Sequence, residues 1–161
     1  LTKDMEADII DGAYWLRKPG PNPDCVIIAM GAVMSEAIEA VGHLADKRRD
    51  VGLLAVTSAD RLNAGWTAAT KARAQGYNAP PSAIERLLSG LAPHTLLVSI
   101  LDAHPATLSW IGGVRGHRMV SLGVEHFGQS GTIKDLYRHF EIDARAILEA
   151  VQSATPGRPI I

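Results

Sequence analysis

Three short, nearly continuous apolar runs constrain this chain more than any other feature. They are Cys25–Met30, Val51–Val56 and Thr95–Ile100. A strand with one face in water alternates apolar and polar residues, whereas a strand buried on both faces does not. The runs therefore predict central strands of a parallel sheet, because helices cover both faces of such a sheet.

Signals for helices separate these runs. After the first run, apolar residues recur at a spacing of three or four, at Met34, Ile38, Val41 and Ala45. After the second run, Asp60 is the predicted N-cap of a helix that ends near Gly76. Further helix starts are predicted at Ser82–Glu85, Pro105, Thr132–Asp135 and Asp143.

Two more short strands complete the expected sheet, one before the apolar runs and one after them. They are Ala13–Leu16 and Met119–Leu122. Strands thus alternate with helices along the chain, and this order predicts an α/β fold. We expect a three-layer, doubly wound, mostly parallel sheet with helices on both faces.

The charge and the apolar content limit the partners of the chain. A formal net charge of −1 creates no long-range attraction for nucleic acid or for an anionic membrane. The densest basic run, Lys47–Arg49, lies between Asp46 and Asp50, which predicts the solvated end of a helix. No apolar stretch approaches the roughly 20 residues of a membrane span. The single cysteine, Cys25, favours a cytoplasmic location.

Two places at the expected carboxyl edge of the sheet are candidates for a ligand site. Gly31 follows the first apolar run, and such a strand-to-helix turn can bind phosphate through backbone N–H groups. A tight turn is the simpler interpretation, because no full glycine-rich phosphate motif is present. Asp102 and His104 follow the third run, where an aspartate could orient an imidazole for proton transfer, or could cap the helix that Pro105 opens.

The six histidines do not predict a metal site. No H-x-x-x-H or H-E-x-x-H spacing occurs among them, and no G-x-S-x-G serine motif is present. The residues by themselves therefore predict an α/β domain without a self-contained active site, and they do not name a function.

The first strands resemble a known family. Gly12–Arg17 resembles the G-x-Y-x-L-R strand that opens the C-terminal domain of transketolases. Asp24–Gly31 resembles the next element of that domain, an apolar strand that ends at a glycine. Val56-Thr57-Ser58 fits the end of the following strand in the family, near V-x-S.

The most specific stretch lies later in the chain. Gly123–Ser130, which contains His126 and Phe127, resembles the G-x-x-x-F-G-x-S motif of the same family. Leu136–Asp143 resembles the helix end that precedes the last helix of the family. These motifs, which follow the family's order, make the chain similar to a C-terminal domain of the transketolase and pyruvate dehydrogenase superfamily.

Details favour one branch of this superfamily. The long segment between Val56 and Leu101, together with Arg138-His139-Phe140, resembles the homodimeric decarboxylating component of the pyruvate dehydrogenase complex. Leu108-Ser109-Trp110 is closer to the L-G-W of transketolases. A true transketolase C-terminal domain therefore stays open as an alternative.

The resemblance implies a domain organisation. It covers residues 12–152, and we expect 1–161 to be a single domain with flanking segments at 1–11 and 153–161. The chain begins at Leu1 rather than at methionine, and we expect it to be a piece of a longer protein.

The resemblance also implies an enzyme that uses thiamine diphosphate and Mg²⁺, which the N-terminal and middle domains would hold. We therefore expect no catalytic, cofactor-binding or metal-binding residue here. The implied partners are those two domains, a second subunit in a homodimer, and a lipoyl acyltransferase. A free-standing ligand-binding or oligomerisation module without catalysis is the other alternative. Candidates for a ligand edge or an interface are Gly31, Asp102, His104, His126 and Phe127.

Overall fold

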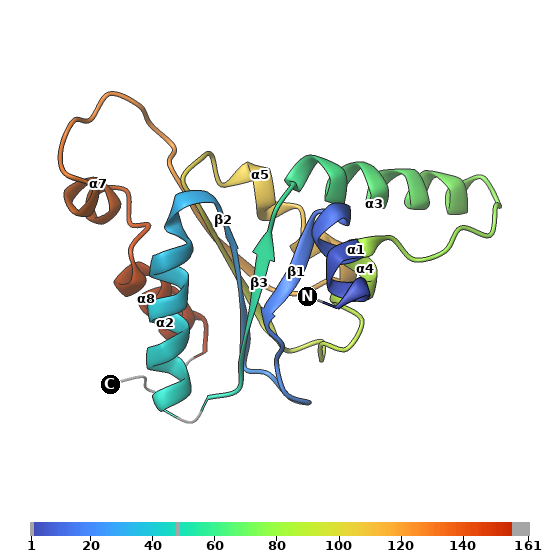
Figure 1. Cartoon of the computed structure of the whole chain (residues 1–161), viewed down its shortest axis with the longest axis horizontal. Helices are drawn as coiled ribbons and strands as arrows, with labels where there is room; N and C mark the ends of the chain where they lie inside the picture. The colour runs from blue at the N-terminus through green and yellow to red at the C-terminus, as the bar shows by residue number, and fades with distance from the viewer. Residues whose placement is uncertain (1, 48, 156–161) are drawn as a thin grey trace.

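A five-stranded sheet runs through the centre of the computed structural model, which describes residues 2–47 and 49–155 (Figure 1). The strand order is β1-β3-β2-β4-β5. The last four strands of the chain are parallel to one another, and β1 pairs antiparallel with β3 at one edge. The strands are β1 (Ala13–Arg17), β2 (Cys25–Met30), β3 (Val51–Val56), β4 (Leu96–Leu101) and β5 (Met119–Leu122).

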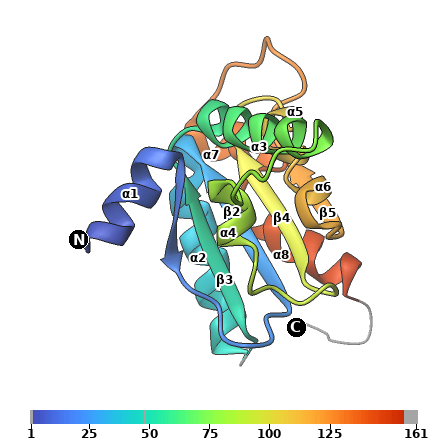
Figure 2. The same ribbon diagram turned by 90° about the vertical axis from the view of Figure 1, so that its right-hand side faces the viewer.

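Helices cover both faces of the sheet, as Figure 2 shows. α2 and α8 pack on one face, and α3 to α6 lie on the other. The predicted three-layer α/β fold is confirmed. The helices are α1 (Lys3–Asp11), the 3-10 turn η1 (Gly31–Val33), α2 (Met34–Asp46), α3 (Ala59–Ala74), α4 (Ala83–Leu87), α5 (Ala106–Ser109), α6 (Gly112–Arg115), α7 (Ile133–His139) and α8 (Ala144–Ala154). None of these helices has the length and apolar character needed to cross a membrane.

The apolar runs are buried on both faces, as their composition predicts. Ile27 belongs to the core cluster under α2 and α8, whereas its neighbour Ile28 belongs to the cluster under α3 and α4. Both side chains are fully buried. Burial of one such side chain contributes about 1.5–3 kcal/mol, so the two clusters together hold the three layers in place.

Two local predictions for the helices are wrong. The N-cap of α3 is Ser58, whose Oγ accepts a hydrogen bond from the Arg61 N–H at 3.3 Å, so Asp60 lies inside the first turn. On α2, Ile38 is 51% exposed, because the neighbouring Ala37 packs on the sheet instead. Small residues on this face let the helix approach the strands closely.

The flanking segment 1–11 contains a helix that the sequence did not predict. Thr2 caps α1 by accepting a hydrogen bond from the Met5 N–H at 3.3 Å. The far end of α1 is fixed to the turn after β3, where the Thr57 hydroxyl donates to the Ile9 carbonyl at 2.7 Å. Position 1 and positions 156–161 of the flanking segments lie outside the described residues.

The basic run predicted to be solvated contains a buried cation. Arg49 is only 8% exposed. Its Nε lies 3.5 Å from Oδ2 of Asp24, and its Nη2 donates to Oγ1 of Thr155 at 3.2 Å. Arg49 thus connects the starts of β2 and β3 to the end of α8. The prediction is wrong for this residue because both partners are distant in sequence, and Arg48 lies outside the described residues.

A buried histidine gives the fold a pH dependence. His117, before β5, is 7% exposed, and neither ring nitrogen has a hydrogen-bond partner among the described residues. Burial lowers the pKa of His117 from 6.5, and the positive charge of Arg115 lowers it further. The nearby backbone of Thr95 raises the pKa in part, without completing a hydrogen bond to the ring.

We therefore expect His117 to destabilise the fold in acid. Above pH 6.5 the imidazole is neutral in both states. As the pH falls through this value, the unfolded chain binds a proton that the native chain does not, and stability drops until the lower native pKa is reached. His117→Gln should show a smaller fall in melting temperature between pH 7 and pH 5, measured by circular dichroism. Equal falls in the two proteins would contradict this assignment.

Candidate functional site

The order of strands reverses between β2 and β4, and the ends of these strands hold the first candidate site. From β2 the chain passes to β3 on one side and then crosses to β4 on the other. Ligands of open α/β sheets bind at the carboxyl ends of strands at such a point. Gly31 follows β2 and Asp102 follows β4, so the structure brings these two candidates together.

The Asp102 carboxylate occupies this point. Its Oδ2 accepts a hydrogen bond from the Ala32 N–H at 3.4 Å. Gly31 has a φ of 83°, and a Cβ at this position would overlap Oδ1 of Asp102. An anion bound to the turn would need the space that the carboxylate fills. The chain therefore supplies its own anion to the turn between β2 and α2.

A second carboxylate makes the same region more negative. Glu36, in the first turn of α2, accepts a hydrogen bond from the Ala144 N–H at 2.9 Å and so satisfies the start of α8. Burial raises the pKa of Tyr137, and the charges of Asp102 and Glu36 raise it further. Two carboxylates close to one phenol disfavour a phosphate ligand here.

His104 has a different role from the one that its position suggested. Its Nδ1 accepts a hydrogen bond from the Ala106 N–H at 3.2 Å, so His104, and not Asp102, satisfies the start of α5. The structure shows no hydrogen bond or ion pair between His104 and Asp102, both of which are described residues. The geometry for a proton relay between them is therefore absent.

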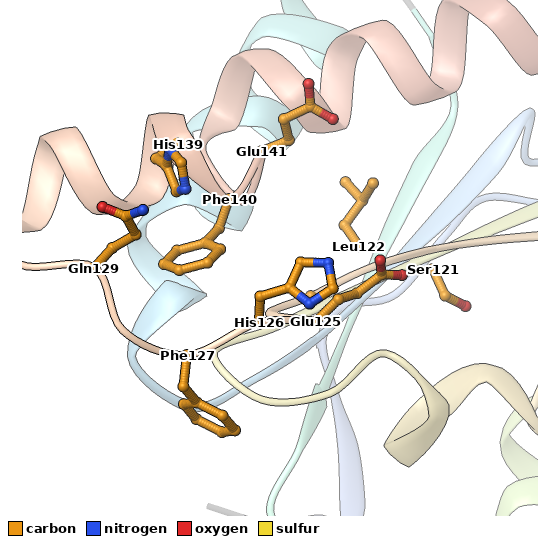
Figure 3. A pocket seen from close by; sticks show the side chains of 10 residues that line it. Ser121, Leu122, Glu125, His126, Phe127, Gln129, His139, Phe140 and Glu141 are labelled. Carbon is orange, nitrogen blue, oxygen red and sulfur yellow. The ribbon is translucent and has the colours of Figure 1, made fainter.

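The other two candidates, His126 and Phe127, lie on the loop between β5 and α7, at a separate place from Gly31. Beside this loop is an open hollow of about 420 Å³, which Figure 3 shows. The loop forms one wall, and the corner between α7 and α8 forms another (Figure 3). The lining residues are Ser121, Leu122, Gly123, Glu125, His126, Phe127, Gln129, His139, Phe140 and Glu141.

Two glycines shape this loop. Gly123 passes so close to the chain after β4 that an added Cβ would lie 2.5 Å from the Ala103 carbonyl oxygen. The next residue, Val124, donates its N–H to the same oxygen at 2.9 Å. Gly128 has a φ of 112°, which side chains rarely tolerate. The glycines of the G-x-x-x-F-G-x-S pattern are thus required by the backbone path.

A strained residue closes the opposite wall. Glu141 has a φ of 54°, the only positive value of a non-glycine residue in the described part of the chain. It follows α7 in a Schellman motif, since its N–H donates to Arg138 and the Ile142 N–H donates to Tyr137. Glycine is preferred at this position, so a glutamate here is held against its backbone preference.

Neither place fits thiamine diphosphate with its metal. Within residues 2–47 and 49–155, no three His, Cys, Asp or Glu side chains are grouped closely enough to hold a metal ion. The turn that could accept a phosphate holds the Asp102 carboxylate instead. The arrangement can present polar and apolar groups to a partner, but it does not form a nucleophile and base pair.

Sequence reasoning missed Glu36, Gly123 and Glu141 as individual residues. Only Gly123 carried a signal, because it opens the recognised loop motif. The roles of Glu36 and Glu141 depend on contacts with α8 and on one backbone angle, and neither is visible in local sequence.

One comparison with known proteins shows a family. The model of the "Transketolase-like TK C-terminal domain" family matches residues 12–143. A comparison with curated protein sequences found no match.

Solved structures with the same fold are transketolases. A transketolase from Campylobacter jejuni superposes with a TM-score of 0.66 and 19% identity, over 91% of this chain and 19% of its own. A transketolase from Leishmania mexicana superposes with a TM-score of 0.63 and 18% identity, over 95% of this chain and 20% of its own. A split-gene transketolase, whose structure is described as an "inactive beta4 tetramer", superposes with a TM-score of 0.56 and 16% identity. The match covers 89% of this chain and 42% of that one. The chain thus spans about a fifth of the first two structures.

Proposed function

Because this chain belongs to the family of transketolase-like C-terminal domains, we propose that it serves as the C-terminal structural and dimer-stabilising domain of a thiamine-diphosphate-dependent enzyme. The observation that carries this proposal is the family match over 12–143, combined with a carboxyl edge that Asp102 already fills. A domain whose usual ligand crevice holds its own carboxylate contributes shape and contact surface rather than reacting groups.

The cofactor would be held elsewhere in the enzyme. Thiamine diphosphate, when bound, stabilises a carbanion, and the protein positions it. We assign that role, and the Mg²⁺ that accompanies the diphosphate, to N-terminal and middle domains. Residues 12–152 would pack against those domains as one unit, with residues 1–11 and 153–161 flanking it.

We further propose a pyruvate dehydrogenase-like, acyl-transferring oxidoreductase within the family, working in the cytoplasm as a homodimer with a lipoyl acyltransferase. Support comes from Gly123–Ser130, Arg138-His139-Phe140 and the long segment that contains α3 and α4. A true transketolase is the second candidate, favoured by Leu108-Ser109-Trp110. Release of carbon dioxide from pyruvate by the full-length enzyme would support the first candidate, and two-carbon transfer between sugar phosphates would support the second.

The structural role has a direct test. Calorimetry of the 161-residue chain with thiamine diphosphate and Mg²⁺ should detect no binding, while the full-length enzyme binds both. Removal of this domain from the full-length enzyme should lower the melting temperature and weaken the dimer, while cofactor affinity in the remaining dimer persists. Tight binding by the isolated chain, or complete loss of cofactor affinity in a dimer that stays folded, would contradict the proposal.

A further inference from the structure

Phe127 is the most exposed large apolar side chain that the structure describes. It is 97% exposed, whereas the apolar core side chains of β2 are fully buried. The loop that carries it protrudes beyond α7 and α5 in Figure 1. Figure 3 shows the ring turned away from the hollow. Aromatic side chains, phenylalanine among them, are enriched where one protein surface packs on another.

The loop holds this ring outward through its backbone. The hydrogen bond from Val124 to Ala103 fixes the start of the loop, and Gly123 allows the close approach that the bond needs. Gly128, directly after the phenylalanine, supplies the left-handed turn. The backbone thus has defined contacts or angles on both sides of Phe127.

The hollow beside Phe127 is lined by acidic residues and by histidines. It contains the carboxylates of Glu125 and Glu141, the imidazoles of His126 and His139, and no lysine or arginine. Neither carboxylate has a hydrogen bond or an ion pair with any described residue. Glu141 belongs to this wall although its backbone has a positive φ of 54°. A basic side chain is the group whose charge complements such a hollow.

We propose that Phe127 and the hollow form one docking surface for a neighbouring domain of the same enzyme. That domain would offer an apolar pocket to the ring of Phe127 and a lysine or arginine to Glu125 and Glu141. This inference rests on the proposed function. The matching part is about a fifth of the transketolases from Campylobacter jejuni and Leishmania mexicana. Under the proposed function, this domain likewise has other domains to contact.

A second copy of the chain fits this surface poorly. A contact of this surface with the same surface of a second copy would bring the two Phe127 rings together, or would place a ring in a hollow that contains two carboxylates. Neither arrangement gives Glu125 and Glu141 an opposite charge. The occupant must therefore differ from the surface itself, as a neighbouring domain does.

A thiol reporter in the hollow tests the proposal. Gln129→Cys places a thiol at the hollow and leaves Phe127 intact. The only native cysteine of the chain, Cys25, is buried and its pKa is raised to about 12, so it does not react with maleimide. Tyr77→Cys is the control, because Tyr77 is 68% exposed and follows the far end of α3, away from the loop (Figure 1).

Labelling is measured on the peptide that carries each new thiol. Both thiols should react rapidly in the isolated chain. In the full-length enzyme, labelling at position 129 should slow at least about tenfold, with position 77 unchanged. Adding Phe127→Ser should restore fast labelling at 129, and Phe127→Trp should not. The double change Glu125→Gln and Glu141→Gln should restore it in part, whereas Glu39→Gln on α2 should not.

Two outcomes separate this inference from the proposed function. If the full-length enzyme binds thiamine diphosphate but labels equally fast at 129 and 77, the docking surface is refuted and the enzyme assignment stands. If the full-length protein does not bind thiamine diphosphate, the proposed function fails. Protection at 129 that Phe127→Ser does not relieve would also overturn the role of the ring.

Discussion

Replacing Gly123 with alanine should lower the free energy of unfolding by about 2–4 kcal/mol. The added Cβ would lie 2.5 Å from the Ala103 carbonyl oxygen and 2.9 Å from Cδ of Pro105. Both are parts of the backbone or of a rigid ring, so neither can turn aside. The loop must move, and the hydrogen bond from Val124 to Ala103 is lost with it. Chemical denaturation of the isolated chain, followed by circular dichroism, measures the change.

The matched control is Gly113→Ala. Gly113 lies in α6, has no positive φ and has open space where a Cβ would project. Its replacement should leave stability unchanged or raise it by less than about 1 kcal/mol, because alanine favours the helix. If the two variants were equally stable, the close approach at Gly123 would not be what fixes the loop.

The comparison of sequence with structure separates two kinds of information. The strands β2, β3 and β4 could be predicted because two-sided burial leaves a continuous apolar pattern in local sequence. The meeting of Gly31 with Asp102 could not be predicted with the same certainty. It depends on which side of β2 receives β4, and strand order leaves no local trace.

The loop after β5 shows a different limit. Its motif was recognised by resemblance, but the reason for each glycine became visible only from the structure. Gly123 is needed because a side chain there would collide with a carbonyl that follows β4, and Gly128 is needed because its φ is positive. The exposure of Phe127 leaves no mark in local hydrophobicity, because apolar residues occur both in cores and on surfaces. Local composition therefore predicts the core strands of this domain better than it predicts which surface residues are exposed.

The prediction that Arg49 is solvated was wrong for a related reason, since its partners are distant in sequence. Its buried position leads to the second large expected effect. Arg49→Ala should lower the free energy of unfolding by about 3–5 kcal/mol, because it removes a buried cation from beside a largely buried carboxylate. The side chains of Arg49 and Asp24 are 7% and 17% exposed. Lys47→Ala, in the same basic run but exposed, should change stability by no more than about 0.5 kcal/mol. Chemical denaturation of both variants measures the two changes. Equal small losses would mean that Arg49 is as solvated as Lys47.

A double-mutant cycle shows how much of this effect belongs to the ion pair. If Arg49 acts through Asp24, then Asp24→Asn should already remove part of the stability, and Arg49→Ala should cost less in that background. We expect a coupling of about 1–3 kcal/mol that persists in high salt, because a buried pair is little screened. Additive losses would instead assign the effect to other contacts of Arg49, among them the hydrogen bond to Thr155 at the end of α8. Arg49→Lys keeps the charge but cannot reach both partners with one planar group, so it should recover only part of the loss.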